Sequence, residues 1–333
     1  MTSTKQTLKA RFIVFVITLL AIISLNPIPI IAAENNSKPV VVATTTVLAS
    51  VVEDLAGDKV VIEYIVLPSV CPAHHDIKPS DIEKLRLASL ILAHGVEPWL
   101  DKLLEASGSQ APVAWIKGSW NTPSAAKSLY TNVAQALKTH LGLDVEAALN
   151  RCLKIIDDVD RRLRRLSEDY NFKEAPVVVM VWQRPFIEYL GFKVVASYNP
   201  PEKVSLKEYE EVLRNASEHR ALLVIDNVPS GVELGLGIAS KVGAVHVALH
   251  NFPRAVREAN NLTAMMLYNA ELLGMALNEA RNARTLETLI TENLSLRSSL
   301  DSLTVYLGSS IIVNAILALA LAVSLIKLRR FTK

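Results

Sequence analysis

Side chains able to bind a metal ion gather in two parts of this sequence. Residues 71–76 offer one thiol, two imidazoles and one carboxylate, and Pro72 and Pro79 restrict their backbone. His250 and Asp226 each follow a short apolar run. Imidazole, thiolate and carboxylate are the usual protein ligands of zinc, and carboxylate also suits manganese. The candidate metal ligands are therefore His74, His75, His250 and Asp226.

Each candidate ligand also has an ordinary structural explanation. A histidine pair in a loop can simply be solvated, His250 can be a capping or core residue, and Asp226 can N-cap the helix expected after it. His94, directly before Gly95, is expected to lie in a turn that leads into a helix rather than to bind metal. The sequence leaves these alternatives open.

A repeated pattern predicts the elements that position these residues. A short apolar run, a helical stretch, a glycine and another apolar run occur four times, two copies before residue 120 and two after residue 175. This order is typical of βαβ units, and continuous apolar strands indicate parallel sheets buried on both faces. We predict an α/β fold of two lobes, each with a roughly four-stranded parallel sheet flanked by helices. The runs begin at Val40, Ala88, Val177 and Leu222, and the glycines are Gly57, Gly108, Gly191 and Gly243.

The segment between the lobes reads as helical. Pro123 opens one helix, which reaches about Leu141, and Asp144 caps a second, which reaches about Tyr170 and has apolar residues three to four positions apart. The second helix, about 36 Å or more long, can join both lobes as a spine. The predicted organisation is an N-terminal lobe at 38–122, a helical linker with the spine helix at 123–172, and a C-terminal lobe at 173–283.

Ligands of open parallel sheets lie outside the carboxyl ends of the strands. The loops expected there contain the candidate ligands and several further residues. Large aromatic side chains at such positions either wall a cleft or simply pack. The predicted cleft lining is Cys71, Trp120, Trp182 and Gln183.

Both ends of the chain carry membrane-type signals. Residues 1–33 hold three basic residues followed by a long apolar run, which predicts a signal peptide or an N-terminal anchor. Residues 284–304 are a polar, helix-prone stalk, 305–326 are long enough for a transmembrane helix, and the basic segment 327–333 is a cytoplasmic tail. Asn314 is expected to face a neighbouring helix or to be tolerated singly. The chain should thus sit in the cell membrane by a single C-terminal anchor, with its binding domain extracellular.

Several function classes find no support in the sequence. The net charge of +2 and the lack of a basic stripe give no case for nucleic acid. No Walker loop or HExxH-like motif occurs, so neither ATP hydrolysis nor metalloenzyme activity is expected. Cys152 reads as a core residue rather than the disulfide partner of Cys71. Four sequons agree with export: Asn35, Asn215, Asn261 and Asn293.

Over residues 38–283 the chain resembles the metal-binding lipoprotein family of zinc and manganese uptake systems. The resemblance rests on the order and spacing of several motifs, none of them specific alone. These are Ala56-Gly57-Asp58-Lys59-Val60, Pro72-Ala73-His74 leading to Pro79-Ser80-Asp81, His94-Gly95-Val96-Glu97-Pro98-Trp99-Leu100, Trp120-Asn121-Thr122-Pro123, residues 186–191, and Tyr268-Asn269.

The resemblance implies two lobes joined by a long helix and a metal held by four side chains between them. His74, with His75 as a rival, and His250 match two of the ligand positions, whereas the others fall on Gly118 and on residues 180–183, which lack histidine and glutamate. A shell rich in imidazole would favour zinc over manganese, with Cys71, Asp226 and water completing it.

The implied function is the substrate-binding component of an ABC importer, which delivers its ion to a permease driven by a separate ATPase. It implies no enzyme activity and no catalytic cofactor, because the metal is cargo. Two alternatives keep the fold: one takes a small organic molecule or metal chelate as cargo, and the other is a non-transporting surface adhesion or interaction protein.

Overall fold

The computed structural model describes residue 15 and residues 37–331. The chain divides into two compact units, residues 1–38 and Pro39–Lys333, and the second contains every element discussed below. Apart from residue 15, the signal peptide or anchor predicted for residues 1–33 lies outside the described residues.

The first lobe is built on a parallel four-stranded sheet with the order β2-β1-β3-β4. All residues of the central strand β3, Leu90–Ala93, are buried, as its continuous apolar sequence predicts. The other strands are β1 (Val40–Ala43), β2 (Val61–Tyr64) and β4 (Val113–Trp115). The helices are α2 (Thr46–Ala56), η1 (Gly57–Lys59), η2 (Pro72–His74), α3 (Pro79–Arg86) and α4 (Leu100–Ser107).

The second lobe repeats this arrangement with the order β6-β5-β7-β8, again parallel throughout. Its strands are β5 (Pro176–Met180), β6 (Lys193–Tyr198), β7 (Leu223–Asn227) and β8 (Val245–Leu249). Its helices are α7 (Arg184–Tyr189), η3 (Pro201–Lys203), α8 (Leu206–Glu218), η4 (Val228–Ser230), α9 (Glu233–Val242) and η5 (Arg257–Ala259). The predicted pair of four-stranded parallel sheets is confirmed.

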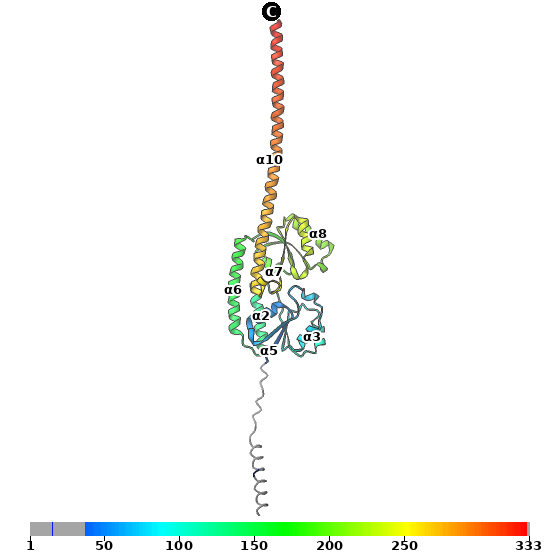
Figure 1. Cartoon of the computed structure of the whole chain (residues 1–333), viewed down its shortest axis with the longest axis vertical. Coiled ribbons are helices and arrows are strands. Elements are labelled where there is room, and N and C mark those ends of the chain that lie inside the picture. The colour runs from blue at the N-terminus through cyan, green and yellow to red at the C-terminus, as the bar shows by residue number, and fades with distance from the viewer. Residues whose placement is uncertain (1–14, 16–36, 332–333) are drawn as a thin grey trace, which may run out of the picture. The chain divides into compact units, whose positions relative to one another are not determined.

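Two helices link the lobes along one side, as Figure 1 shows for α6 and the first part of α10. The linker consists of α5 (Pro123–Leu141) and the spine helix α6 (Glu146–Asp169). Through one buried stripe α6 joins a hydrophobic core that includes residues of both sheets. Cys152 belongs to this stripe, and both Cys152 and Cys71 are free thiols, which agrees with a core position rather than a disulfide.

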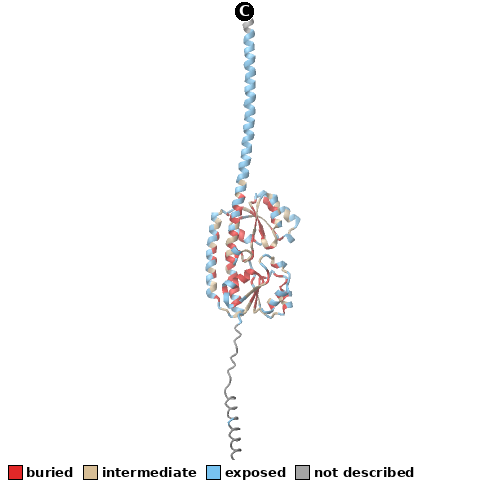
Figure 2. Cartoon of the chain, viewed as in Figure 1, coloured by how far each residue is buried: buried red, intermediate tan, exposed pale blue. Residues whose placement is uncertain are grey.

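The C-terminal helix α10 (Leu262–Phe331) is continuous and joins the end of the predicted C-terminal lobe, the stalk predicted at 284–304 and the membrane segment predicted at 305–326. Its first turns pack in the core as far as Ala280, while residues 285–327 are exposed, as Figure 2 shows. At the transition, Arg281 donates to the carbonyl oxygens of Tyr170 and Asn171, both at 2.7 Å. Arg284 donates to the carbonyl oxygens of residues 220 and 221. These four bonds hold α10 against the end of α6 and the second lobe.

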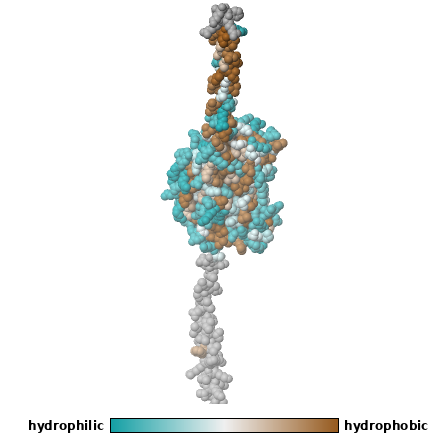
Figure 3. Space-filling view, turned by 45° about the horizontal axis from the view of Figure 1, so that its top comes forward, coloured by the Kyte–Doolittle hydropathy of each residue, from teal (hydrophilic) through white to brown (hydrophobic). Residues whose placement is uncertain are grey.

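The outer half of α10 is strongly apolar. In the described part of the chain, α10 is the one helix that is both long and apolar enough to cross a membrane. Figure 3 shows mostly hydrophobic residues over this stretch, beyond a more hydrophilic stretch next to the lobes. Length and composition therefore agree with a membrane-crossing segment near residues 305–326.

Close packing between α10 and α6 predicts a sharp penalty for a single methyl group. A Cβ atom on Gly274 would lie 2.4 Å from the Tyr170 ring, so Gly274→Ala should lower the free energy of unfolding by about 1–3 kcal/mol. Gly237→Ala is the control, because nothing lies within 4 Å of the added methyl group and helix propensity should raise stability by about 0.5–1 kcal/mol. Thermal denaturation of both variants tests this, and equal melting temperatures would contradict the packing.

Candidate functional site

The carboxyl ends of both sheets border a cleft between the lobes. One hollow takes Cys71, Pro72, Ala73, Val96 and Trp120 from the first lobe, and Trp182, Asn227, Pro229, Ser230, Asn251 and Phe252 from the second. An adjoining hollow of about 320 Å³ shares both tryptophans and extends past Gly118 and Asn121. Gln183 is fully buried and donates to Asn227, which lines the first hollow. The cleft walls are thus mostly apolar and aromatic.

His74 is the predicted ligand that contacts the opposite lobe. Its Nε2 lies 3.4 Å from Oε1 of Glu202, which belongs to η3 of the second lobe, and both side chains are about half exposed. A polar contact this exposed contributes at most about 1 kcal/mol to stability. Both groups therefore remain available to another partner.

His75 supports the loop from within. Its buried Nε2 lies 2.8 Å from Oδ2 of Asp81, and its ring lies 5.0 Å from the Trp99 ring. Asp81 also accepts from the backbone N–H of Lys78, while Trp99 donates to the carbonyl oxygen of Pro72. These contacts hold the loop that carries His74, so the role of His75 in this arrangement is to position that loop.

His94 forms a buried network at the end of β3. Its Nδ1 lies 3.2 Å from the Ile116 carbonyl oxygen and its Nε2 lies 2.9 Å from the Thr45 hydroxyl. Burial lowers the pKa of His94 to about 4, so the ring is neutral, with Nδ1 donating and Nε2 accepting. Glu97 accepts from the backbone N–H groups of His94, Gly95 and Val96. The predicted turn into a helix is confirmed, since α4 begins at Leu100.

Asp226 lies inside β7 and is buried, so the prediction that it N-caps the next helix is wrong. That helix, α9, begins at Glu233. One carboxylate oxygen of Asp226 accepts from the Tyr198 hydroxyl at 2.5 Å, and the other lies 2.8 Å from Nε2 of His246. Burial and the neighbouring carboxylate raise the pKa of Tyr198. Both oxygens of Asp226 are thus occupied within the second lobe.

His250 keeps a free ring nitrogen at the end of β8. Asn269 holds its backbone, accepting from the N–H at 3.1 Å and donating to the carbonyl oxygen at 2.7 Å. Burial lowers the pKa of the imidazole, which favours the neutral ring. Its Nδ1 is buried and has no hydrogen-bond partner in the described part of the chain. His250 can therefore offer a nitrogen to a ligand without losing an existing bond.

The predicted ligands do not converge in this arrangement. Among residues 15 and 37–327, no three histidine, cysteine, aspartate or glutamate side chains form a group that could hold a metal ion. The ligand set His74, His75, His250 and Asp226 stays a prediction. Sequence reasoning missed two residues at the cleft. Glu202 is an exposed glutamate without any local sequence signal, whereas Asn251 could have been noticed because it directly follows His250.

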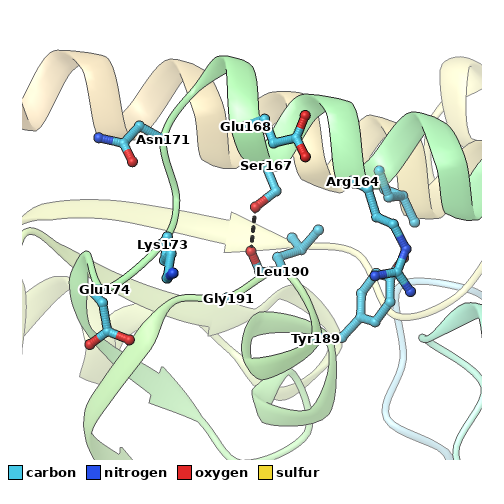
Figure 4. Close-up of a pocket in the computed structure, with 10 residues that line it drawn as sticks. Arg164, Ser167, Glu168, Asn171, Lys173, Glu174, Tyr189, Leu190 and Gly191 are labelled. Carbon is cyan, nitrogen blue, oxygen red and sulfur yellow. Dashed lines mark hydrogen bonds between the residues drawn. The ribbon is translucent and has the colours of Figure 1, made fainter.

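A further surface hollow of about 600 Å³ lies elsewhere, between α6 and α7 (Figure 4). Residues 171–174 and 189–191 of its lining precede β5 and β6, so it lies at the amino ends of these strands. Ser167 donates to the Leu190 carbonyl oxygen across it, and the other labelled polar side chains do not point to one centre. This groove lies between two elements at the amino ends of the strands, whereas ligands of parallel sheets lie outside the carboxyl ends.

A family model described as the zinc-uptake complex component A, periplasmic, matches residues 41–276. The chain belongs to this family. Its fold also matches solved structures, among them a manganese-bound periplasmic metal-binding protein from Candidatus Liberibacter asiaticus, with a TM-score of 0.63 and 14% identity over 72% of this chain and 100% of that one. A zinc-bound ZnuA with residues 138–173 deleted gives a TM-score of 0.61 and 18% identity over 72% of this chain and 98% of that one.

Curated relatives of this zinc-uptake family member match shorter segments. The metal ABC transporter substrate-binding lipoprotein SsaB of Streptococcus sanguinis is 29% identical over 85 residues, which cover 24% of this chain and 28% of SsaB. The uncharacterized protein RP014 of Rickettsia prowazekii is 43% identical over 56 residues, which cover 17% of this chain and 19% of that protein. The chain thus spans less than a third of either relative.

The buried neutral ring of His94 predicts a loss of stability in acid. The unfolded chain takes up a proton near pH 6.5 and the folded chain only near pH 4, so stability is lost as pH falls through this window. The loss attributable to His94 is about 3 kcal/mol. Urea denaturation of the wild type and His94→Gln between pH 7 and 4 measures it. The variant should be less stable at pH 7 but should lose less on acidification, and parallel curves would contradict the neutral ring.

Proposed function

We propose that this chain is the extracytoplasmic substrate-binding component of an ABC importer, which holds a divalent transition-metal ion between its lobes and delivers it to a permease. Membership in the zinc-uptake family supports the class of cargo. The observation that carries the proposal is the contact between His74 and Glu202. These two side chains can bind metal, come from opposite lobes and lie beside a cleft that is lined by residues of both lobes. A separate ATPase would drive release, and binding itself involves no chemical step.

The geometry of this pair suits zinc. Two donors bound to one tetrahedral zinc ion at about 2.0–2.1 Å lie roughly 3.3 Å apart. Nε2 of His74 and Oε1 of Glu202 are 3.4 Å apart, so an ion can enter with little change in their separation. Imidazole favours zinc over manganese, while the free Nδ1 of His250 and water are the further donors we propose. Coordination would then tie the two lobes together, so that the metal-bound chain would differ in structure from the metal-free chain.

The exposed apolar half of α10 supports a location at the membrane. Residues 305–326 exceed the roughly 20 helical residues that span a hydrocarbon core of about 30 Å. The basic residues that follow favour the cytoplasmic side, which leaves the lobes outside the cell. We therefore propose a cell-surface receptor tethered by this helix.

Zinc titration tests the proposal. The full chain in detergent micelles should bind zinc by calorimetry. The His74→Ala, His250→Ala double variant should bind at least roughly a hundredfold more weakly, since the loss of each ligand should cost more than about 1.4 kcal/mol. His140→Ala is the matched control, because His140 is exposed on α5, outside the cleft lining. Failure to bind zinc, or equal affinity in the double variant, would overturn the proposal.

A second cargo, a metal chelate or small organic molecule, is favoured by the cleft walls. The Oδ1 atoms of Asn121 and Asn251 are buried without hydrogen-bond partners in the described part of the chain, and both residues line the adjoining hollow of the cleft beside Trp120 and Trp182. Asn121 donates its amide N–H to the Trp182 carbonyl oxygen at 3.1 Å, which fixes Oδ1 as the free acceptor. A flat cargo with N–H groups would stack on the indoles and satisfy these oxygens.

Trp182→Leu distinguishes the two cargoes. Loss of one stacking surface should weaken binding of a zinc–histidine complex by roughly tenfold, or about 1.4 kcal/mol, while the affinity for zinc alone stays unchanged. Trp115→Leu is the control, because Trp115 is 47% exposed against 46% for Trp182 but lies outside the cleft lining. An equal effect of Trp182→Leu on both ligands would count against the chelate, and calorimetry measures both.

A further inference from the structure

The exposed part of α10 directly after the lobes carries a regular leucine seam. Its members recur at alternating intervals of three and four residues, with Asn293 filling the one gap in the series. All are more than half exposed, and no other described element covers them. The seam consists of Leu286, Leu289, Leu296, Leu300, Leu303 and Leu307. This 3.5-residue period over three heptads is the pattern of one strand of a coiled coil.

We propose that the leucine seam pairs with the same seam of a second copy of this chain, forming a parallel two-stranded coiled coil. Residues 286, 293, 300 and 307 take the a positions and residues 289, 296 and 303 the d positions. Of the f positions on the opposite face, Thr291 and Ser298 are polar, and the third, Val305, is the first residue of the proposed membrane span. The apolar side therefore has one direction, which a single partner helix can cover.

Charge complementarity identifies the partner and its direction. Glu292 precedes the a position at Asn293 and is a g residue, while Arg297 follows the d position at Leu296 and is an e residue. In a parallel pair, g of one helix faces e of the next heptad on the other, so Glu292 meets Arg297 of the second copy twice by symmetry. Residues five apart on one helix do not face each other. The charges thus suit a second copy in register.

Asn293 strengthens the choice of a two-stranded pair. A single asparagine among apolar a positions fixes register and oligomeric state, because the two amides can hydrogen-bond only with each other. In this pair the Asn293 amide is buried, so this one sequon would carry no glycan. Asn314 lies three heptads later, at an a position within the proposed membrane span. An amide there can hydrogen-bond across helices in lipid, where water offers no alternative. Both exposed asparagines on α10 beyond the lobes therefore fall on one seam.

Cysteine cross-linking of the full chain in membrane vesicles tests the pairing. With Cys71→Ser removing the half-exposed native thiol, Leu289→Cys and Leu303→Cys should each give a disulfide-linked dimer with copper phenanthroline. The yield should exceed that of the f-position control Ser298→Cys by about fivefold or more. Equal yields at the f position, a product of another mass, or cross-linking only when the two d-position variants are mixed would overturn the parallel dimer.

A charge swap tests the register separately. Glu292→Arg and Arg297→Glu should each lower the Leu303→Cys dimer yield by about threefold or more, since each puts like charges opposite one another. The double variant should return to within about twofold of the starting yield. A double variant as poor as the single ones would overturn the Glu292–Arg297 pairing. The charge swaps lie outside the cleft, so they should leave the zinc affinity of the Cys71→Ser background unchanged.

Discussion

Parallel strands place their carboxyl ends at one edge, and this constraint governs the whole molecule. Each sheet must return its chain by a helix over a face, so both faces are covered and only the edge loops stay free to bind. The two lobes obey this rule with the same strand order and meet along their loop edges, where both contribute to one lined hollow. The position of the cleft thus follows from topology before any particular side chain is considered.

The side chains around the cleft divide into those that build it and those that remain available. His94 and Asp226 use all their side-chain polar atoms on neighbours in their own lobe, and His75 uses its Nε2 in the same way. His74 and His250 differ, because one has only an exposed partner across the cleft and the other has an unbonded ring nitrogen. A buried side chain whose polar atoms are already hydrogen-bonded is suited to a structural role, because a new ligand would have to break those bonds first.

The sequence predicted the fold well because periodicity is a local property. The four apolar runs became buried strands, and the predicted helix from Pro123 to about Leu141 has those bounds in the structure. The site was predicted less completely, because a hydrogen-bond partner is chosen in three dimensions. The sequence around Asp226 does not predict its hydrogen-bond partners Tyr198 and His246. The sequence around His74 does not predict its contact with Glu202. The sequence predicted which loops lie at the cleft, but it did not predict the hydrogen-bond partners of their side chains.

The contact of Gly274 with Tyr170, together with the Arg281 and Arg284 bonds to backbone oxygens, has a mechanical consequence. One uninterrupted helix passes from the core of the second lobe into the segment proposed to cross the bilayer, without a hinge residue between them. The four arginine bonds tie the start of the exposed segment to the end of α6 and to the second lobe. If the cleft holds the proposed cargo, its opening would then move the first lobe relative to the second lobe and α10.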